Sequence, residues 1–274
     1  MKVYDFNIHL PCNLTSDVNS SIASENSMTL KNLEYCYTNY TQSFKNHIKA
    51  GNFMLFNQNI FFEDDLTSFI KSVKDDFNSS MVTALIDFRK DNVMEYLDRA
   101  ISNGIDSIKF HSYNQKITEA DFITIVKICQ YVQEKNIIIS IDTSYGTSKM
   151  YVYDNMKLAC FISDFITKVP IVLLHSGGAR VIEAMLLADE KKNIFLDTSF
   201  SVITYLDSSL ERDFAYTYKK IGSNRVIYGS DTPYINVAES INQTVDFLEK
   251  YKFTNSDIEN ILFNTSNNLK SFDV

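Results

Sequence analysis

The chain has 274 residues and a formal net charge of −8, with 26 basic and 34 acidic side chains. A nucleic-acid-binding protein normally carries a basic stripe, and this sequence has no dense run of Lys or Arg, so DNA and RNA are excluded as expected partners. Hydrophobic residues make up 45% of the chain and charged residues 22%, close to the globular average. This composition and length predict one large domain over residues 1–274.

The N-terminus and the cysteines indicate the expected cellular compartment of the protein. Residues 1–10 mix polar with apolar side chains, so they predict neither a signal peptide nor a membrane span. The four cysteines, Cys12, Cys36, Cys129 and Cys160, include no Cys-x-x-Cys pair, and we expect them to be reduced thiols. We therefore expect a cytoplasmic protein with no membrane partner.

Short β-rich runs alternate with longer helical patterns along the whole chain. The runs predict eight strands, at residues 3–10, 53–57, 81–88, 106–111, 137–142, 169–175, 193–199 and 225–231. Apolar residues spaced by three or four predict helices at residues 30–48, 66–73, 93–101, 122–132, 150–166, 180–190 and 210–221, and further helical pieces close the chain.

This alternation determines the expected topology. Strands that alternate with helices pair in parallel through right-handed crossovers. An open sheet would bind a nucleotide through a Gly-rich first turn, and no such turn follows the first predicted strand. The sequence therefore predicts an α/β fold, a single-domain (β/α)₈ TIM barrel.

Polar side chains stand at the ends of several predicted strands. Three of the four histidines, His9, His111 and His175, and two acids, Asp142 and Asp231, occupy such positions. In a barrel the carboxyl ends of the strands form the mouth, where the chemistry takes place. Buried imidazoles and carboxylates are costly unless they pair with each other or bind a metal. We expect these five side chains to converge in one site.

Two of the strands contribute a second polar side chain on the same face. Asn7 is two residues before His9, and Lys109 is two residues before His111. Side chains two apart on a strand point to the same side. The sequence thus predicts that Asn7 and Lys109 also face the site.

Five motifs lie on the predicted strands and a sixth lies near the end of the chain. They are residues 5–9 (DFNIH), 108–111 (IKFH), 170–178 (PIVLLHSGG), 193–199 (NIFLDTS), 225–233 (RVIYGSDTP) and 261–265 (ILFNT). In this order, and over almost the whole chain, they resemble the amidohydrolase superfamily in its amidohydrolase-2 branch of metal-dependent hydrolases. The resemblance implies a TIM-barrel enzyme that acts on a small cyclic or carboxylated substrate.

The resemblance also implies a metal site. Its pattern has His-x-His on strand one, a His ending each of strands five and six, and an Asp on strand eight. His9, His175 and Asp231 match this pattern, whereas Asn7 and Asp142 stand where histidines are expected. Amide and carboxylate oxygens are harder donors than imidazole. The resemblance therefore implies Zn²⁺ first and Mn²⁺ second, and it leaves loss of the metal open.

Other polar residues near these motifs have two competing interpretations. Lys109, His111 and Arg180 are candidates to stabilise an oxyanion or to anchor an anionic substrate, although an Arg at a helix start is as often solvated. His111 is also a candidate to replace a missing imidazole ligand. Asp142 is either a metal ligand or the charge partner of Lys109 or Arg180. Pocket-lining candidates at the end of strand seven are Asp197 and Ser199.

Three functions remain open on this sequence. The first is a metal-dependent hydrolase of a lactone or amide, in which Asp231 takes the proton of a metal-activated water. The second is a non-oxidative decarboxylase or hydratase on the same fold, which Asn7 favours. The third is a metal-free barrel that only binds a ligand. A small molecule is the expected partner, and the resemblance leaves a homodimer open.

Overall fold

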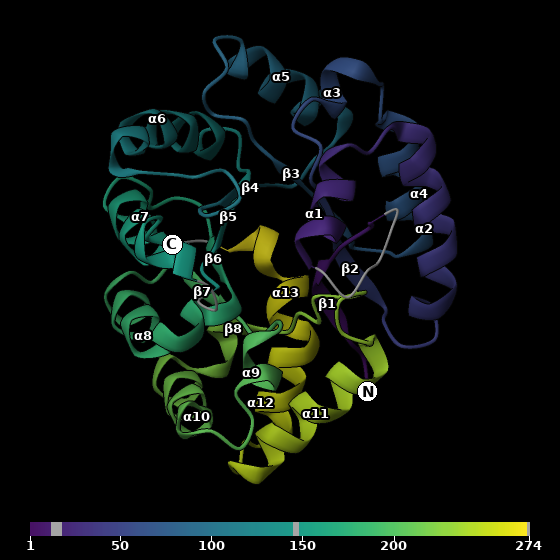
Figure 1. Ribbon diagram of the computed structural model, residues 1–274. Coiled ribbons are helices and arrows are strands. Elements are labelled where there is room, and N and C mark those ends of the chain that lie inside the picture. Colours follow the sequence, from purple (N-terminus) through teal and green to yellow (C-terminus); the bar gives the residue numbers. More distant parts are fainter. Residues whose placement is uncertain (12–17, 145–147, 273–274) are drawn as a thin grey trace.

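The computed structural model describes residues 1–11, 18–144 and 148–272, so Cys12 lies outside the described residues. Within these ranges eight parallel strands neighbour one another in sequence order and are surrounded by helices (Figure 1). The strands are β1 (Tyr4–Ile8), β2 (Ala50–Leu55), β3 (Met81–Leu85), β4 (Ser107–His111), β5 (Ile138–Asp142), β6 (Ile171–Leu174), β7 (Ile194–Asp197) and β8 (Val226–Ile227). The protein is a single-domain (β/α)₈ TIM barrel, as the sequence predicts.

Helices cover the outside of the barrel. They are α1 (Val18–Asn26), α2 (Leu30–Phe44), α3 (Ile60–Glu63), α4 (Thr67–Asp76), α5 (Val93–Asn103), α6 (Phe122–Gln133), α7 (Asn155–Ser163), α8 (Val181–Glu190), α9 (Ser201–Thr204), α10 (Ser209–Ile221), α11 (Val237–Lys250), α12 (Asn255–Glu259) and α13 (Thr265–Asn267). Shorter 3₁₀ and π turns are η1 (Glu119–Asp121), η2 (Ser148–Tyr151), η3 (His175–Arg180), η4 (Ser223–Arg225), η5 (Asn260–Asn264) and η6 (Leu269–Ser271). In the described part of the chain, none of these helices combines the length and apolar character needed to cross a membrane.

Each of the seven predicted helices exists, although the predicted helix at 150–166 is shared between η2 and α7. The short or weakly patterned helices α1, α3 and α9 were not predicted. Local signals explain several helix ends. Thr29 accepts a hydrogen bond from the Asn32 N–H at the start of α2, and Gly104 ends α5 with a φ of 100°.

Backbone hydrogen bonds between the first and last strands close the barrel. The Phe6 N–H donates to the Tyr228 carbonyl at 2.9 Å, the Asp231 N–H to the Asn7 carbonyl at 3.0 Å, and the His9 N–H to the Thr232 carbonyl at 2.7 Å. These bonds extend past the two residues of β8, so the chain closes the barrel where the regular strand has already ended.

Several predicted strands are too long. Residues 225–231 were predicted as a strand, but only Val226–Ile227 are regular, and Asp231 lies beyond them with a φ of 63°. His175 and His9 also lie just after β6 and β1. The second strand begins earlier than predicted, at Ala50. His111 and Asp142 still belong to the regular ladder, whereas His9, His175 and Asp231 lie just beyond it.

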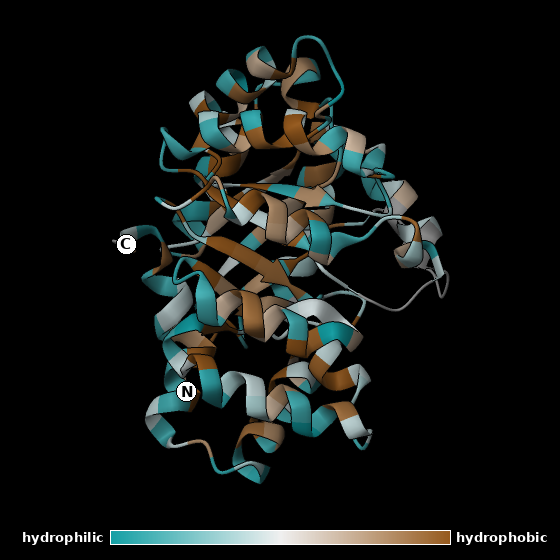
Figure 2. Ribbon diagram, turned by 90° about the vertical axis from the view of Figure 1, so that its left-hand side faces the viewer, coloured by the Kyte–Doolittle hydropathy of each residue, from teal (hydrophilic) through white to brown (hydrophobic). Residues whose placement is uncertain are grey.

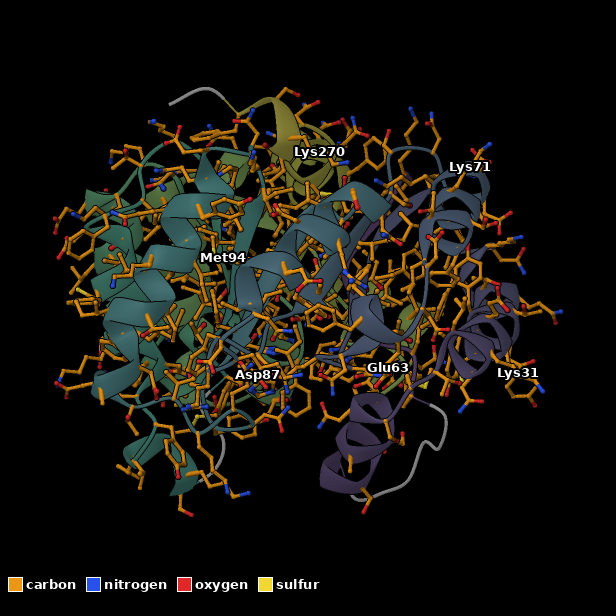
Figure 3. All side chains as sticks on the ribbon, turned by 90° about the horizontal axis from the view of Figure 1, so that it is seen from above. Lys31, Glu63, Lys71, Asp87, Met94 and Lys270 are labelled. Carbon is orange, nitrogen blue, oxygen red and sulfur yellow. The ribbon has the colours of Figure 1, made fainter. Side chains whose placement is uncertain are left out.

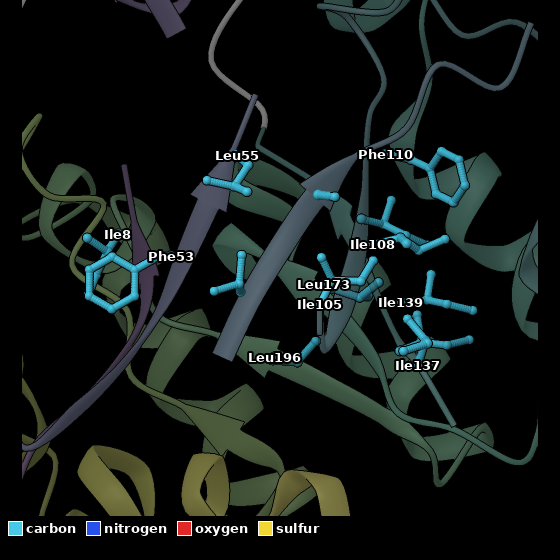
Figure 4. Close-up of a cluster of buried hydrophobic side chains, with 14 of the residues drawn as sticks. Ile8, Phe53, Leu55, Ile105, Ile108, Phe110, Ile137, Ile139, Leu173 and Leu196 are labelled. Carbon is cyan, nitrogen blue, oxygen red and sulfur yellow. The ribbon is translucent and has the colours of Figure 1, made fainter. Parts of the chain in front are cut away.

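Two apolar clusters pack on opposite sides of the sheet. The inner cluster fills the barrel and includes Tyr4, Phe6, Met54, Val172, Phe195 and Ile227. The outer cluster lies between strands and helices and includes Ile8, Phe53, Leu55, Ile108, Phe110 and Leu173 (Figure 4). In the hydropathy colours the surrounding helices alternate between brown and teal segments, and a broad brown strand is visible between them (Figure 2). Charged side chains such as Lys31 and Lys71 lie on the periphery (Figure 3).

A register shift in β1 decides which of its side chains face inward. Tyr4 and Phe6 belong to the inner cluster, whereas Ile8 belongs to the outer one. A regular strand would keep Phe6 and Ile8 on the same face. The irregularity between Asp5 and Ile8 in the β1–β2 pairing changes this phase. It allows both Asn7 and His9 to reach the mouth of the barrel.

Candidate active site

The first part of the site lies where β1 meets β8. His9 Nε2 lies 3.4 Å from Asp231 Oδ1, and Asn7 Nδ2 donates to the same oxygen at 3.1 Å. On the other edge of the His9 ring, Nδ1 lies 3.0 and 3.1 Å from the two carboxylate oxygens of Glu25 in α1. We call Asn7, His9, Glu25 and Asp231 the β1/β8 side of the site.

The second part lies at the ends of β4, β5 and β6. Asp142 Oδ2 is its centre, at 3.2 Å from His175 Nε2, 3.5 Å from His111 Nε2 and 3.7 Å from Lys109 Nζ. The pairing of β4 with β5 sets His111 directly opposite Asp142. Lys109 is 1% exposed although it carries an ammonium group. We call Lys109, His111, Asp142 and His175 the β4–β6 side.

The end of β7 joins the two sides. Ser199 Oγ accepts a hydrogen bond from Asn7 Nδ2 at 3.0 Å and lies 3.1 Å from His175 Nδ1, and it also bonds to Asp197. The Asp197 carboxylate accepts the backbone N–H groups of His175 at 3.0 Å and Ser199 at 2.9 Å. Asp197 and Ser199 therefore connect the two sides and fix their relative position.

Neighbouring carboxylates keep two of the histidines charged. Burial lowers the pKa of a histidine, but the charge of Glu25 and hydrogen bonds to Asp231 and Glu25 outweigh it and raise the pKa of His9 to about 9. For His175 burial is likewise outweighed, mainly by the charge of Asp142 and the hydrogen bond to it, and its pKa rises to about 9. At neutral pH both rings are imidazolium ions.

His111 behaves in the opposite way. Burial is the main cause that lowers its pKa; the charge of Asp142 opposes this, the charges of Lys109, His175 and His9 lower the pKa further, and it falls to about 3. The ring is therefore neutral at neutral pH. Its Nδ1 is buried and has no hydrogen-bond partner among the described residues.

Both site aspartates are held ionised. Burial raises the pKa of Asp231, but the hydrogen bond from His9 and the positive charges of His175, His9 and Lys109 outweigh burial and leave the pKa below its usual value. Burial of Asp142 is similarly outweighed by its contacts with His111, His175 and Lys109, which hold its pKa well below 3.8.

Aromatic rings enclose these charged groups. Phe56 packs on His9 with ring centroids 4.9 Å apart, and Lys109 Nζ lies 4.7 Å from the centroid of the Phe56 ring. Tyr113 packs on His111 at 4.4 Å and Tyr234 on His9 at 5.2 Å. These rings lower the local dielectric and so strengthen the charge interactions between them.

The backbone is strained at the site. His175, Ser176 and Asp231 have φ values of 66°, 51° and 63°, and Phe200 has a φ of 56°. Residues other than glycine rarely adopt this region, and such strain persists where surrounding contacts over-determine it. At His175 and Asp231 this backbone conformation directs the side chains into the mouth of the barrel.

The structure brings most predicted site residues together. His9, His175 and Asp231 converge with Asn7 and Asp142, and Lys109 and His111 meet Asp142, as expected from their strand positions. Of the two charge partners suggested for Asp142, Lys109 is the one found.

The Arg180 guanidinium binds Asp154 at 2.7 Å and Glu183, and its role in the site stays a prediction. The i+3 spacing of Glu183 from Arg180 already favoured this local pair.

Four residues of the site were not predicted. Glu25 gives no sequence signal, because it lies in a helix without a clear apolar stripe. Phe56 follows Met54 on the inward phase of the second strand, and Tyr234 follows the GSDTP motif, so both positions were accessible to sequence reasoning. Tyr113 lies two residues after His111 and has the same signal.

The site does not match the metal centre that the resemblance implies. Among the described residues, no group of three or more His, Cys, Asp or Glu side chains is placed to hold a metal ion. Asn7 turns its amide N–H groups toward Asp231 and Ser199, while its oxygen is buried without a hydrogen-bond partner in the part of the chain that the structure describes. The Lys109 ammonium already supplies a fixed positive charge among the carboxylates. The expected donors, as placed, do not fit a divalent ion.

Comparison with solved structures gives the same fold at low sequence identity. An uncharacterised TIM-barrel protein from Bordetella bronchiseptica is 13% identical, with 99% of each chain covered and a TM-score of 0.74. A probable 2-pyrone-4,6-dicarboxylic acid hydrolase from Acinetobacter baumannii, with citric acid bound, is 12% identical, covers 99% of this chain and 100% of its own, and has a TM-score of 0.66. A 2,6-dihydroxybenzoate decarboxylase from Rhizobium is 11% identical, with 99% of each chain covered and a TM-score of 0.65.

Comparison at the level of sequence identifies one family. Among curated proteins no sequence matches this chain. A family model described as amidohydrolase, Amidohydro_2, matches residues 74–265, well over half of the chain. This match includes the segments that supply Lys109, Asp142, His175 and Asp231. The chain therefore belongs to the Amidohydro_2 family of amidohydrolases and is an enzyme of that superfamily.

Proposed function

We propose that the protein is a hydrolase that cleaves a small carboxylated lactone, ester or amide at the mouth of the barrel. One observation carries this proposal. Asp231 is an ionised carboxylate, 9% exposed, that faces the positively charged groups of the site. Such a carboxylate is unprotonated at neutral pH and therefore available to take a proton from water, while the cations suit the anionic groups that develop on the substrate.

The residues of the chain divide this reaction between them. Asp231 accepts a proton from a water molecule as the water oxygen bonds to the substrate carbonyl carbon. Lys109 and the His175 imidazolium stabilise the negative charge that moves onto the carbonyl oxygen. The carbon–oxygen or carbon–nitrogen bond to the leaving group then breaks, and a protonated imidazole donates a proton to that group. The products are a carboxylic acid and an alcohol or amine.

A second candidate is a non-oxidative decarboxylase. The specific observation in its favour is the His175 imidazolium, a buried acid with a pKa of about 9. In this reaction the bond between the carboxylate and its neighbouring carbon breaks, CO₂ leaves, and the electron pair on the carbon takes a proton from the imidazolium. One of the structural neighbours is named as such an enzyme.

Whether the protein binds a metal ion is a separate question. Members of the family usually bind a divalent metal ion. Zinc or manganese in this chain stays a prediction, and so do the cytoplasmic location and the homodimer. Elemental analysis of protein purified without chelators or a metal-affinity column measures the metal directly.

The test of the proposal is an assay on two compounds. The purified protein is incubated with 2-pyrone-4,6-dicarboxylate, a carboxylated lactone, and with 2,6-dihydroxybenzoate. Ring opening is followed by absorbance and acid release, and CO₂ is measured in both reactions. We expect turnover of the lactone, or of related carboxylated esters and amides in a wider panel, without release of CO₂.

The matched control is Asp231→Asn, which keeps the size of the side chain and removes its basicity. General acid–base catalysis contributes about 10²- to 10⁴-fold, so we expect activity to fall by at least about 100-fold. Release of CO₂ without hydrolysis would select the decarboxylase. Full activity of Asp231→Asn would refute the role of Asp231.

A further inference from the structure

Helix α1 turns a carboxylate toward the protein interior. Only Ser21 and Glu25 are buried among the side chains of α1 that the structure describes, and Glu25 is 2% exposed. A helix that packs through polar residues contributes little hydrophobic stabilisation, and a buried carboxylate is costly unless several donors satisfy it. The position of Glu25 therefore needs an explanation in its contacts. In Figure 3 α1 is the purple helix that projects from the barrel near Glu63.

Three donors surround the Glu25 carboxylate. His9 Nδ1 lies 3.0 and 3.1 Å from its two oxygens, the Leu10 backbone N–H donates to it at 3.0 Å, and the Tyr234 hydroxyl donates at 3.1 Å. These donors come from the ends of β1 and from the segment after β8. Glu25 thus binds together the two segments that carry His9 and Asp231.

The contact fixes the orientation of the His9 ring. With Nδ1 held by Glu25, Nε2 points to Asp231 Oδ1 at 3.4 Å, and Phe56 and Tyr234 pack on the ring. Rotation of the ring would break the contacts of both nitrogens at once. A carboxylate behind an imidazole sets which ring nitrogen faces the reacting groups and keeps a proton on the other.

We propose that Glu25 is a positioning residue, which holds the His9 ring so that its Nε2–H faces the Asp231 carboxylate. This contact keeps the carboxylate ionised and oriented for its role as general base. This rests on the proposed function for its catalytic consequence, but not for the geometry itself. Glu25 touches no reacting atom in this scheme. It acts through His9.

The geometry is tested by NMR of protein labelled with ¹⁵N-histidine. The chain has only four histidines, so each ring can be assigned by substitution. We expect the wild-type protein to show a far-downfield Nδ1–H proton that disappears in His9→Gln. In Glu25→Gln, which keeps the shape but weakens the acceptor, this proton should shift upfield, and in Glu25→Ala it should be lost. Tyr234→Phe removes one donor from Glu25 and should shift it less.

The control is Glu211→Gln, at another buried carboxylate on a helix. Glu211 is 3% exposed, accepts the Asp207 N–H at 2.8 Å and binds Lys250 at 2.7 Å. The His9 signal should not change in this variant. An unchanged His9 signal in Glu25→Gln would overturn the proposal. If Glu25→Ala does not fold, Glu25→Gln still decides the matter, because it preserves the volume of the side chain.

The catalytic consequence is measured on whichever compound the wild-type enzyme turns over. We expect Glu25→Gln to lower kcat by about 10-fold while KM stays within about 2-fold, because a hydrogen bond to a charged group is weakened without loss of a substrate contact. Glu211→Gln should keep both values. Unchanged kcat with a shifted His9 signal would refute the positioning role. If no compound is turned over, the proposed function fails while the NMR result on Glu25 stands separately.

Discussion

The two sides of the mouth use the same kinds of side chain to opposite effect. On the β1/β8 side, the two carboxylates of Glu25 and Asp231 surround one imidazolium, so this side is net negative. On the β4–β6 side, Lys109 and the His175 imidazolium surround the single carboxylate of Asp142, so this side is net positive. Both sides are buried, and the difference arises from the ratio of acidic to basic side chains on each side, to which helix α1 adds Glu25 on the β1/β8 side.

This difference gives the site a direction. The anionic groups of a substrate, including the carbonyl oxygen that becomes negative in the reaction, are attracted to the β4–β6 side and repelled from the β1/β8 side. The base Asp231 then faces the reacting bond instead of the carboxylate of the substrate. Electrostatic complementarity of this kind fixes orientation more than affinity.

The largest effect on binding is expected from Lys109→Met, which keeps the length of the side chain and removes its charge. A hydrogen bond or ion pair with a charged group contributes about 1.5–3 kcal/mol, so we expect anion affinity to fall by about 10- to 100-fold. The measurement is calorimetric titration with citrate, 2,6-dihydroxybenzoate and 2-pyrone-4,6-dicarboxylate, using whichever anion binds to the wild-type protein.

Asp231→Asn is the matched variant on the opposite side. Because it removes negative charge, it should bind the same anion at least as tightly as the wild-type protein does. If Lys109→Met kept full affinity, or if both variants lost it equally, the two sides would not differ in the way described.

The sequence predicted those parts of the site whose position follows from strand topology. In a parallel barrel the carboxyl ends of all strands open on one face, so a polar residue at a strand end is placed there whatever its partners are. His9, His175 and Asp231 were predicted on this basis. The closing β8 was predicted too long, because the chain leaves the ladder early while its backbone still bonds to β1.

The rest of the site depends on contacts that no local pattern reports. Glu25 reaches His9 only because α1 packs against the end of β1, and its helix has neither a clear apolar stripe nor a motif. The charge state of each histidine is likewise decided by its neighbours. His9 and His111 are both buried strand-end histidines, and yet the pKa values are about 9 and about 3.

The pH dependence of stability tests whether each side carries its own imidazolium. His9 and His175 have folded-state pKa values of about 9, above the unfolded value of about 6.5. Between these values the folded state binds more protons than the unfolded state, so the free energy of unfolding falls as pH rises. Below about pH 6.5 the contribution is fully present, and above about pH 9 it is lost. Urea unfolding from pH 6.5 to 9.5 should show this fall, on the order of 3 kcal/mol for each imidazole.

Removing one carboxylate at a time assigns the fall to a side. Glu25→Gln should flatten the part that His9 contributes, and Asp142→Asn the part that His175 contributes. Any fall that comes from other groups, such as Asp5 with its pKa raised by burial to about 7, is common to all three proteins. Parallel curves for the wild-type protein and both variants would show that these carboxylates do not hold the imidazoles charged.

The smallest effect on anion affinity is expected from His111→Asn. This variant is informative when it is compared with His175→Asn. Both rings contact the same oxygen of Asp142, at 3.5 and 3.2 Å. Only His175 is charged at neutral pH, because the pKa of His111 is lowered to about 3. Titration with the same anion at pH 7 should therefore show a loss of about 10-fold or more for His175→Asn and less than about 3-fold for His111→Asn. Equal losses would mean that both rings carry charge, and the positive potential of the β4–β6 side would then have to be assigned to both histidines.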